Sequence, residues 1–369
     1  MKTRFTLSVL LTACIALSIV STLSAQENKY PNAKPMFVAG PPHRDIAVRK
    51  APAGNLVQWN GSFTDITKKK VSFTMVGTDP NTTNVSTTIP VFIIPIKMVY
   101  GPTNGKMTFD PVKKKLGNGK TIIQNTIASP IFDPSLNFTQ GGTDVGTTQY
   151  IDAYQRANFW NKVGTAAHKN YHVLFGAPTV LAEQTITVPA SLGSVINNPF
   201  GAGKVGTYDI NAYDAKVQTY MTKFTQINPG VLPIFVTLDT YLTAGGCCIG
   251  GYHNANGAQP TGQTYANFTY VDAPGSFSQD VSALSHEIGE WLDDPFVDNL
   301  VNCADNGIME NGDPNENESN FGGFPYVLNG FTYNLQTLVF IGYFGKTPPP
   351  SVHKWLSFQN DITTVCPGQ

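Results

Sequence analysis

The sequence predicts an α+β protein in which a strand-rich N-terminal part precedes a part where helices and strands are mixed. Runs rich in β-branched residues lie early in the chain, and amphipathic helical patterns begin only near residue 147. Strands first and mixed elements later are typical of this class, whereas strict strand–helix alternation is not. Hydrophobic residues make up 41% of the 369 residues, which is enough for a sizeable core and argues against a disordered chain.

The low charge of the chain limits its partners. Charged residues make up 13% of the sequence and the formal net charge is −1, whereas typical soluble domains are about 25% charged. A protein that binds nucleic acid by neutralising phosphates needs a basic excess, so we expect no nucleic-acid partner. Low charge with many glycine, threonine and aromatic residues favours an exported protein.

Residues 1–25 have the features of a signal peptide. A basic start precedes a mostly apolar run that ends at Val20, and small residues lead to Ala25. We expect cleavage after Ala25 and a secreted protein, extracellular or periplasmic. The Leu-Thr-Ala before Cys14 leaves lipidation of that cysteine as an alternative. No later stretch holds 18 consecutive apolar residues, so we expect no membrane span.

Four cysteines remain after the signal peptide: Cys247, Cys248, Cys303 and Cys366. An even count in an exported chain predicts two disulfides. Because a bond between adjacent cysteines is strained, we expect Cys247 and Cys248 each to pair with Cys303 or Cys366. Four thiolates around zinc are the alternative, but adjacent cysteines lack the usual C-x2-C spacing.

The N-terminal elements follow from composition and alternation. Residues 26–55 are rich in proline and lysine without a hydrophobic period, and are expected to form a flexible lead-in. Residues 56–145 form the strand-rich region. Within it, residues 71–76 alternate as a strand, and residues 89–100 are β-branched with two prolines, which predicts an edge strand or a bend.

Residues 146–369 combine helical and extended patterns. Helices are expected where apolar residues recur at helical spacing, at residues 147–163, 209–224 and 278–294. Short apolar or alternating runs predict strands, at residues 171–175, 184–188, 232–242, 264–271 and 330–344. Glycine-rich or polar composition predicts loops, at residues 247–262 and 299–323.

The predicted helix at residues 278–294 separates its side chains into two faces. At about 100° per residue, Glu290 lies roughly 40° and Asp293 roughly 20° from His286. The polar face also carries Glu287 and Asp294, so it holds one histidine and four carboxylates. The apolar residues share the opposite arc and predict a side that faces the core: Val281, Leu284, Ile288, Trp291 and Leu292.

A solvated surface is one interpretation of this acidic face. Exposed helices usually mix basic residues among the acidic ones at i,i+4 spacing, and this face has none beyond His286. Asp293 and Asp294 also occupy the last turn, where the helix dipole disfavours anions. A bound cation would offset this unfavourable charge, so we favour a metal site.

The motif His286-Glu287-x-x-Glu290 has the spacing of a zinc site. In H-E-x-x-H, two ligands one helical turn apart hold the metal and the glutamate between them polarises its water. Here Glu290 replaces the second histidine, and carboxylate oxygens are accepted zinc ligands. Glu310, which follows 20 residues after Glu290, is the candidate third ligand.

Four further residues are candidates for supporting roles. Asp313 is expected to accept a hydrogen bond from the free nitrogen of His286, and Asp293 is expected to support the ligands from the same helix face. His253 and Tyr252 follow the cysteine pair, and the resemblance of the motif to zincin metallopeptidases, in which a distal histidine or tyrosine binds the oxyanion, implies that role for them. Packing within a loop is the alternative role for His253.

The motif resembles the active-site helix of zinc metallopeptidases of the zincin class. The position of Glu310 is similar to that in the gluzincin branch, where a later glutamate completes the site. Residues 264–271 likewise resemble the zincin edge strand that aligns peptide substrates. The resemblance implies that residues 146–369 form a zincin-like catalytic region in which Glu287 takes a proton from water. One histidine with two carboxylates forms a harder site, so Mn²⁺ and Ca²⁺ are alternatives to Zn²⁺.

A second resemblance covers more of the chain. The stretch from Leu284 to Glu290, the Asp294-Pro295 step and the stretch from Glu310 to Asp313 are similar to secreted proteins that include the plant Exordium, or phosphate-induced, proteins. This resemblance implies export and no particular activity.

Two functions are therefore expected. The first is a secreted metal-dependent hydrolase, a peptidase that acts on peptide or protein substrates. The second is a non-catalytic secreted or cell-wall-associated binding protein with a structural metal. In that protein the aromatic residues, 11% of the chain, would stack on cell-wall glycan. A glycosidase with paired carboxylates is a third class, but no particular pair stands out.

Overall fold

A computed structural model describes residues 29–41, 54–275, 277–302, 307–316 and 318–367. The predicted α+β class is confirmed, with 18% helix and 35% strand spread over several sheets. The expected signal peptide at residues 1–25 and Cys303 lie outside the described residues.

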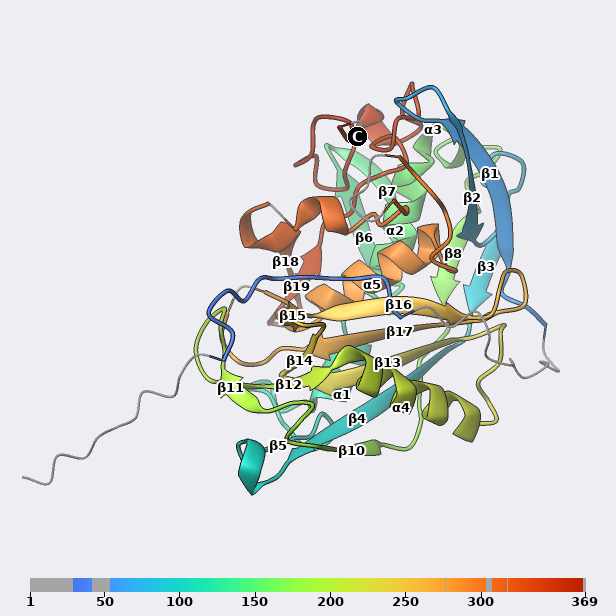
Figure 1. The fold of residues 1–369 in the computed structure, drawn as a ribbon. Coiled ribbons are helices and arrows are strands. Elements are labelled where there is room, and N and C mark those ends of the chain that lie inside the picture. Colours follow the sequence, from blue (N-terminus) through green and yellow to red (C-terminus); the bar gives the residue numbers. More distant parts are fainter. Residues whose placement is uncertain (1–28, 42–53, 276, 303–306, 317, 368–369) are drawn as a thin grey trace, which may run out of the picture.

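The largest sheet forms the centre of the fold (Figure 1). Its strands run in the order β10 (Gln184–Val188), β4 (Val91–Tyr100), β13 (Leu232–Leu238), β17 (Gln263–Tyr270) and β16 (Gly251–Asn256). The first four strands are parallel to one another, and β16 pairs antiparallel with β17. Two short strands, β5 (Thr108–Phe109) and β9 (Thr179–Val180), also pair with β4. Strand β16 therefore lies at the edge of this sheet.

Residues 264–271, expected at a sheet edge, and residues 89–100, expected as an edge strand or a bend, both form internal strands. Strand β17 lies between β13 and β16, so the edge position that we expected for residues 264–271 is wrong. Strand β4 lies between β10 and β13 despite Pro95. Its pairing with β9 covers residues 92–93 and its pairing with β10 begins at residue 96, so the proline falls where the partner changes.

Helix α5 (Ser282–Asp293) packs against β16 and β17 and confirms the expected helix. Leu284, Ile288 and Trp291 are fully buried, as the apolar arc predicts. The indole nitrogen of Trp291 donates a hydrogen bond to Thr264 Oγ1 at 2.9 Å. The acidic face is buried as well, which excludes a solvated surface helix.

Smaller sheets and helices surround this centre. The two-stranded sheets pair β1 (Gln58–Thr64) with β2 (Lys70–Val76), β3 (Ser86–Ile89) with β8 (His172–Phe175), β6 (Leu136–Gln140) with β7 (Thr143–Thr148), and β18 (Gly323–Leu328) with β19 (Phe331–Gln336). A four-stranded sheet joins β11 (Val195–Asn197), β12 (Lys204–Asp209), β14 (Thr240–Thr243) and β15 (Cys247–Ile249). The other helices are α1 (Ile122–Ile127), α2 (Tyr150–Asn158), α3 (Trp160–Val163) and α4 (Ile210–Lys223).

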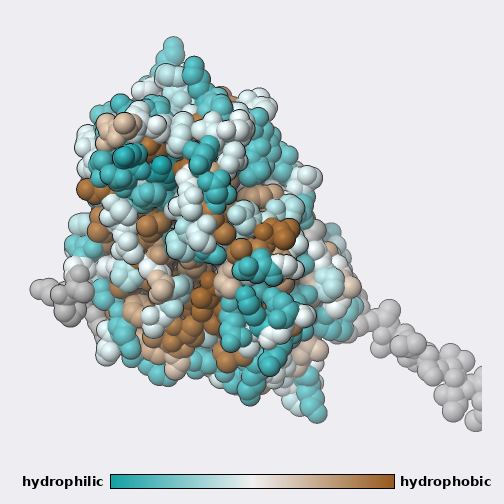
Figure 2. Space-filling model, turned by 180° about the vertical axis from the view of Figure 1, so that it is seen from behind, coloured by the Kyte–Doolittle hydropathy of each residue, from teal (hydrophilic) through white to brown (hydrophobic). Residues whose placement is uncertain are grey.

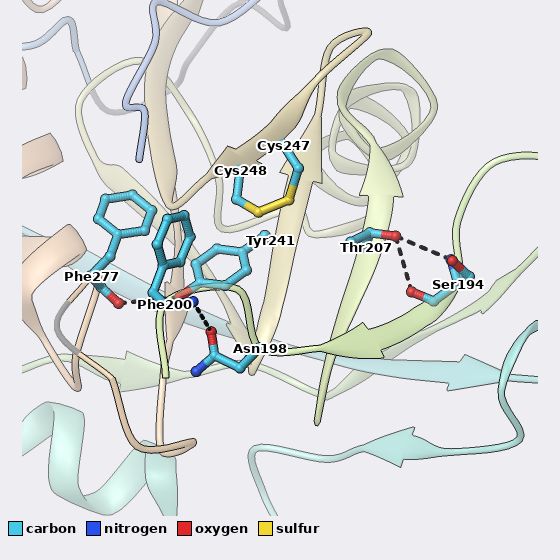
Figure 3. Close-up of a disulfide and its surroundings, with 8 residues drawn as sticks. All are labelled: Ser194, Asn198, Phe200, Thr207, Tyr241, Cys247, Cys248 and Phe277. Carbon is cyan, nitrogen blue, oxygen red and sulfur yellow. Dashed lines mark hydrogen bonds between the residues drawn. A yellow bond between two sulfur atoms is a disulfide. The ribbon is translucent and has the colours of Figure 1, made fainter. Parts of the chain in front are cut away.

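Residues 247–262 differ from the expected loop, because β15 and β16 occupy most of them. The expected cysteine pairing is also wrong: Cys247 and Cys248 are bonded to each other, near the ring of Tyr241 (Figure 3). The peptide bond between them is cis, and their Cα atoms lie 3.0 Å apart. Cys366 also takes part in a disulfide.

The segment 29–41 differs from the flexible lead-in that we expected for residues 26–55. It runs along β15 and β16, and Met36 forms a parallel bridge with Ile249. Its Phe37 is buried in the core. Residues 42–53 lie outside the described part of the chain.

The surface agrees with the low charge of the sequence. Figure 2 shows apolar residues reaching one face in separate patches among hydrophilic ones. Leu300 and Val327 are the most exposed of the large apolar residues in the described ranges. No helix in these ranges is both long enough and apolar enough to cross a membrane.

Candidate metal centre

Three segments bring the candidate ligands together. Helix α5 carries His286, Glu287 and Glu290, the neighbouring strand β16 carries His253, and the chain after α5 returns with Glu310. All five side chains are at most 2% exposed. Burial of so many ionisable groups is unusual unless they are paired or hold a metal.

The ligand atoms form two groups that share Glu290. One group contains His253, Glu290 and Glu310, and the other contains His286, Glu290 and Asp313. Within each group, one ligand atom per residue lies within 4.8 Å of the others, which is compatible with a bound ion. The expected set of His286, Glu290 and Glu310 is thus divided, because Glu310 lies on the His253 side.

Glu290 faces both groups through different oxygens. Its Oε1 lies 2.9 Å from His286 Nε2 and accepts the Gly312 N–H at 3.1 Å, while its Oε2 lies 3.6 Å from His253 Nδ1. The glycine is required at this approach, since a Cβ at Gly312 would overlap the His286 ring. Glu290 is therefore the residue on which both groups depend.

His253 is positioned as a ligand rather than as a loop-packing residue. Its Nε2 donates to the carbonyl of Asp294 at 3.0 Å, which leaves Nδ1 to face the carboxylates. Nδ1 lies 3.6 Å from both Glu287 and Glu290 and 3.9 Å from Glu310. The oxyanion role that we expected for His253 is thus replaced by a place among the candidate ligands.

His286 is oriented by a residue that the sequence analysis missed. Its Nδ1 donates to Gln336 Oε1 at 2.7 Å, and the Gln336 amide in turn donates to the Gly312 carbonyl at 3.2 Å. We expected Asp313 on this free nitrogen, but Asp313 instead lies 3.5 Å from Nε2, on the ligand side. Gln336 lies fifty residues after His286 in a β-strand, and no local pattern marks it.

Asp293 supports the centre indirectly. Its Oδ2 accepts hydrogen bonds from Tyr154 at 2.7 Å and from the Asn311 amide at 3.1 Å. Asn311 also donates to the carbonyl of Gly289 at 3.0 Å. Because Asn311 follows Glu310 directly, this network holds the loop that carries Glu310 against helix α5.

Tyr252 lies on the opposite face of β16 from His253, because successive side chains of a strand point to opposite sides. Its hydroxyl donates to Asp214 Oδ1 at 2.8 Å. It therefore does not point into the centre, where the oxyanion role that we expected would need it. The Tyr265 hydroxyl donates to the same oxygen at 2.7 Å. Tyr252 thus belongs to a separate buried network.

The ionisable groups of the centre shift one another's pKa values. Burial raises the pKa of Glu287 to about 7, and burial together with the Glu290 and Asp313 charges raises the pKa of Glu310 well above its usual range. Burial alone would lower the pKa of His253, but the adjacent Glu287 and Glu290 carboxylates raise it to about 10. Burial opposes ionisation of Glu290, yet the two histidines hold its pKa far below the usual range.

Several buried side-chain atoms of the centre make no hydrogen bond within the described residues, although both histidines lie in ion-pair contact with carboxylates. These atoms are His253 Nδ1, His286 Nε2 and both carboxylate oxygens of Glu287 and Glu310. An unpaired buried carboxylate is costly, and a cation would satisfy these atoms together. The residues present therefore fit a divalent ion.

Comparison with protein-family models, with curated proteins and with solved structures gave no match to this chain. The functional conclusion therefore depends on the geometry of the centre.

Proposed function

We propose that the chain is an exported metal-dependent hydrolase that cleaves peptide bonds. The observation that carries this proposal is the convergence of unpartnered ligand atoms around Glu290. Within the part of the chain that the structure describes, His253 Nδ1 and both oxygens of Glu310 are buried without a hydrogen-bond partner, and both residues lie beside that carboxylate. The resemblance of the His286–Glu290 motif to zincin helices favours a peptide substrate.

His253, Glu290 and Glu310 would hold the ion. One imidazole and two carboxylates are a donor set that suits Zn²⁺ or Mn²⁺. Ca²⁺ usually takes six to eight oxygen ligands, which this group does not supply. Asp294 orients His253 through its backbone carbonyl, as carbonyl partners commonly do for metal-binding histidines.

Glu287 is the candidate general base. When bound, a divalent ion lowers the pKa of a coordinated water and polarises a substrate carbonyl. Glu287 belongs to neither ligand group, its Oε2 lies 3.6 Å from His253 Nδ1, and its oxygens accept no hydrogen bond within the described residues. It can accept the proton of the attacking water and deliver it to the leaving amine. An added Cβ at Gly251 would lie 2.6 Å from Glu287 Oε1, so this glycine leaves room for the carboxylate.

Metal titration combined with peptide digestion tests the proposal. Metal-free protein is titrated with Zn²⁺, Mn²⁺ and Ca²⁺, its metal content is measured, and a peptide mixture is digested with each loaded form. We expect binding of Zn²⁺ or Mn²⁺ and hydrolysis of peptides. Glu287→Gln should keep the metal and lose about 100-fold or more of the hydrolysis. Glu318→Gln, at an exposed glutamate, is the matched control and should leave both unchanged.

The outcomes separate the two functions. Metal binding without any hydrolysis would favour the alternative, a secreted binding protein with a structural metal. Failure to bind any of the three ions would overturn both.

A further inference from the structure

The segment formed by residues 29–41, here called the N-terminal strap, lies over the candidate metal centre. In Figure 1 it is the dark blue segment that runs along β16 on the side away from β17. Beneath it, the ligand side chains are at most 2% exposed, except for Asp313. A hydrolase needs a substrate path to its centre, so the strap occupies the position where that path is expected.

The backbone of the strap pairs with the edge of β15 as an additional strand. The Lys34 and Met36 N–H groups donate to the carbonyls of Cys247 and Cys248, at 2.7 and 2.9 Å. In return, the Cys248 and Gly250 N–H groups donate to the carbonyls of Lys34 and Met36, at 2.7 and 3.0 Å. The strap runs parallel to β15. This is the pattern by which extended peptides add to a sheet edge.

The pairing continues along β16 at the centre itself. The Gly40 N–H donates to the carbonyl of His253, a candidate ligand, at 3.2 Å. A Cβ at Gly40 would lie 2.7 Å from side-chain atoms of both Tyr252 and Asn254. A larger residue at position 40 therefore cannot keep this contact.

One side chain of the strap reaches the centre. The Phe37 ring stacks on the His286 ring with a centroid distance of 3.8 Å. Its backbone N–H donates to Glu316 Oε1 at 2.6 Å. Phe37 is also the one fully buried residue of the strap, whereas Asn32 and Lys34 are exposed. Other apolar side chains of the strap are only partly buried against the core: Tyr30, Ala33, Met36 and Val38. Backbone pairing to a sheet edge with one fully buried anchor is how an extended peptide is commonly recognised.

We infer that the edge formed by β15 and β16 is a binding groove for extended polypeptides, and that residues 34–40 of the chain occupy it as a built-in inhibitor. A substrate segment runs parallel to β15 and places an aromatic residue over His286, where Phe37 lies. The inference deepens the proposed hydrolase function. That the bound polypeptide is a substrate rests on that proposed function. The groove itself rests on the contacts of the strap alone.

Peptide binding to the full-length protein tests the groove without any catalysis. The probe is a fluorescently labelled peptide with the sequence of residues 29–41, followed by anisotropy in metal-free protein. Gly40→Val should displace the strap and bind the peptide. The wild type should bind it at least about tenfold more weakly, because the tethered strap competes at a high effective concentration. A peptide with Phe37→Ala should bind Gly40→Val about tenfold more weakly than the parent peptide.

Hydrolysis by the metal-loaded protein tests the inhibition. Phe37→Ala should cleave a peptide mixture faster than the wild type, and Asn32→Ala, at an exposed residue outside the segment 34–40, should match the wild type. If Gly40→Val does not fold, Phe37→Ala serves for the binding experiment as well. Equal binding of the labelled peptide by wild type and a folded variant would overturn the groove. Preferential binding without hydrolysis would keep the groove and overturn the proposed hydrolase function.

Discussion

The two faces of strand β16 hold buried carboxylates in opposite surroundings. On one face, Asp214 is fully buried and accepts hydrogen bonds from Tyr252, Tyr265 and the Gln218 amide. On the other face, Glu310 is equally buried but has no hydrogen-bond partner within the described residues. Each face is reached by one of two consecutive residues, Tyr252 and His253.

The difference separates a structural carboxylate from a candidate ligand. Hydrogen-bond donors satisfy the Asp214 charge within the chain, so nothing further is needed there. Burial and the charges of the neighbouring carboxylates Glu290 and Asp313 raise the pKa of Glu310. A cation would therefore stabilise the face that carries Glu310, whereas the face that carries Asp214 is already satisfied.

The largest expected effect comes from removing the residue shared by both ligand groups. Glu290→Ala should abolish metal binding. At an ion concentration of about 1,000 times the dissociation constant, it should also remove the roughly 4 kcal/mol of metal-dependent stabilisation. Calorimetry and thermal unfolding with and without Zn²⁺ measure both quantities. Glu318→Ala is the exposed control. A metal-dependent shift that survives in Glu290→Ala would show that the ion binds elsewhere.

Removing the satisfied carboxylate, Asp214, should destabilise the fold without changing metal affinity. Asp214→Ala leaves two buried tyrosine hydroxyls without their acceptor, and we expect a loss of about 3 kcal/mol in the free energy of unfolding. Denaturant unfolding gives the loss, and metal titration gives the control. Weaker metal binding in the folded variant would mean that the two faces are coupled.

Replacing the unsatisfied carboxylate, Glu310, should change the free energy of unfolding in the opposite direction. In the metal-free protein, Glu310→Gln removes an ionisable group whose charged form is disfavoured by burial and by Glu290 and Asp313, and should stabilise the fold by about 1–2 kcal/mol. With metal present the wild type should be the more stable protein, because the variant has lost a ligand. Unfolding of both proteins in chelator and in Zn²⁺ checks this reversal. If the metal-free Glu310→Gln variant is less stable than the wild type, then Glu310, like Asp214, is a structural carboxylate and not a ligand.

The smallest expected effect concerns Tyr252. Tyr252→Phe removes one hydrogen bond to Asp214 and should cost about 1 kcal/mol of stability. Peptide hydrolysis and metal affinity should stay at the wild-type level, because the hydroxyl points away from the centre. A loss of hydrolysis in stable protein would restore the oxyanion role that the sequence favoured.

The helix of the centre could be predicted from sequence because its signal is local. The apolar arc of α5 and the spacing of His286 and Glu290 lie within one element, and the arc predicted the burial of Trp291 correctly. The position of Glu310 was predicted only in part, because its partner in space is His253. Glycines at 250 and 251 and the adjacent cysteines hid the strand that carries that histidine.

Other contacts of the centre depend on long-range pairing that no local pattern carries. Gln336 reaches His286 from β19, and its side chain looks ordinary in the sequence. The strap pairs with β15 and β16 through backbone hydrogen bonds, which any residue except proline can donate. Because such pairing leaves no side-chain pattern, the proline- and lysine-rich composition of the segment predicted a flexible chain instead.

The stacking of Phe37 on His286 also has a kinetic consequence. We expect an ion in the centre to exchange with solvent when the strap lifts, because Phe37 covers His286 and the ligands are almost wholly buried. The residence time of the ion is then set by the opening rate of the strap rather than by the strength of its bonds to the ligands. We expect a chelator to strip the wild type slowly, at a rate independent of chelator concentration, and Phe37→Ala to release its ion faster at a similar affinity.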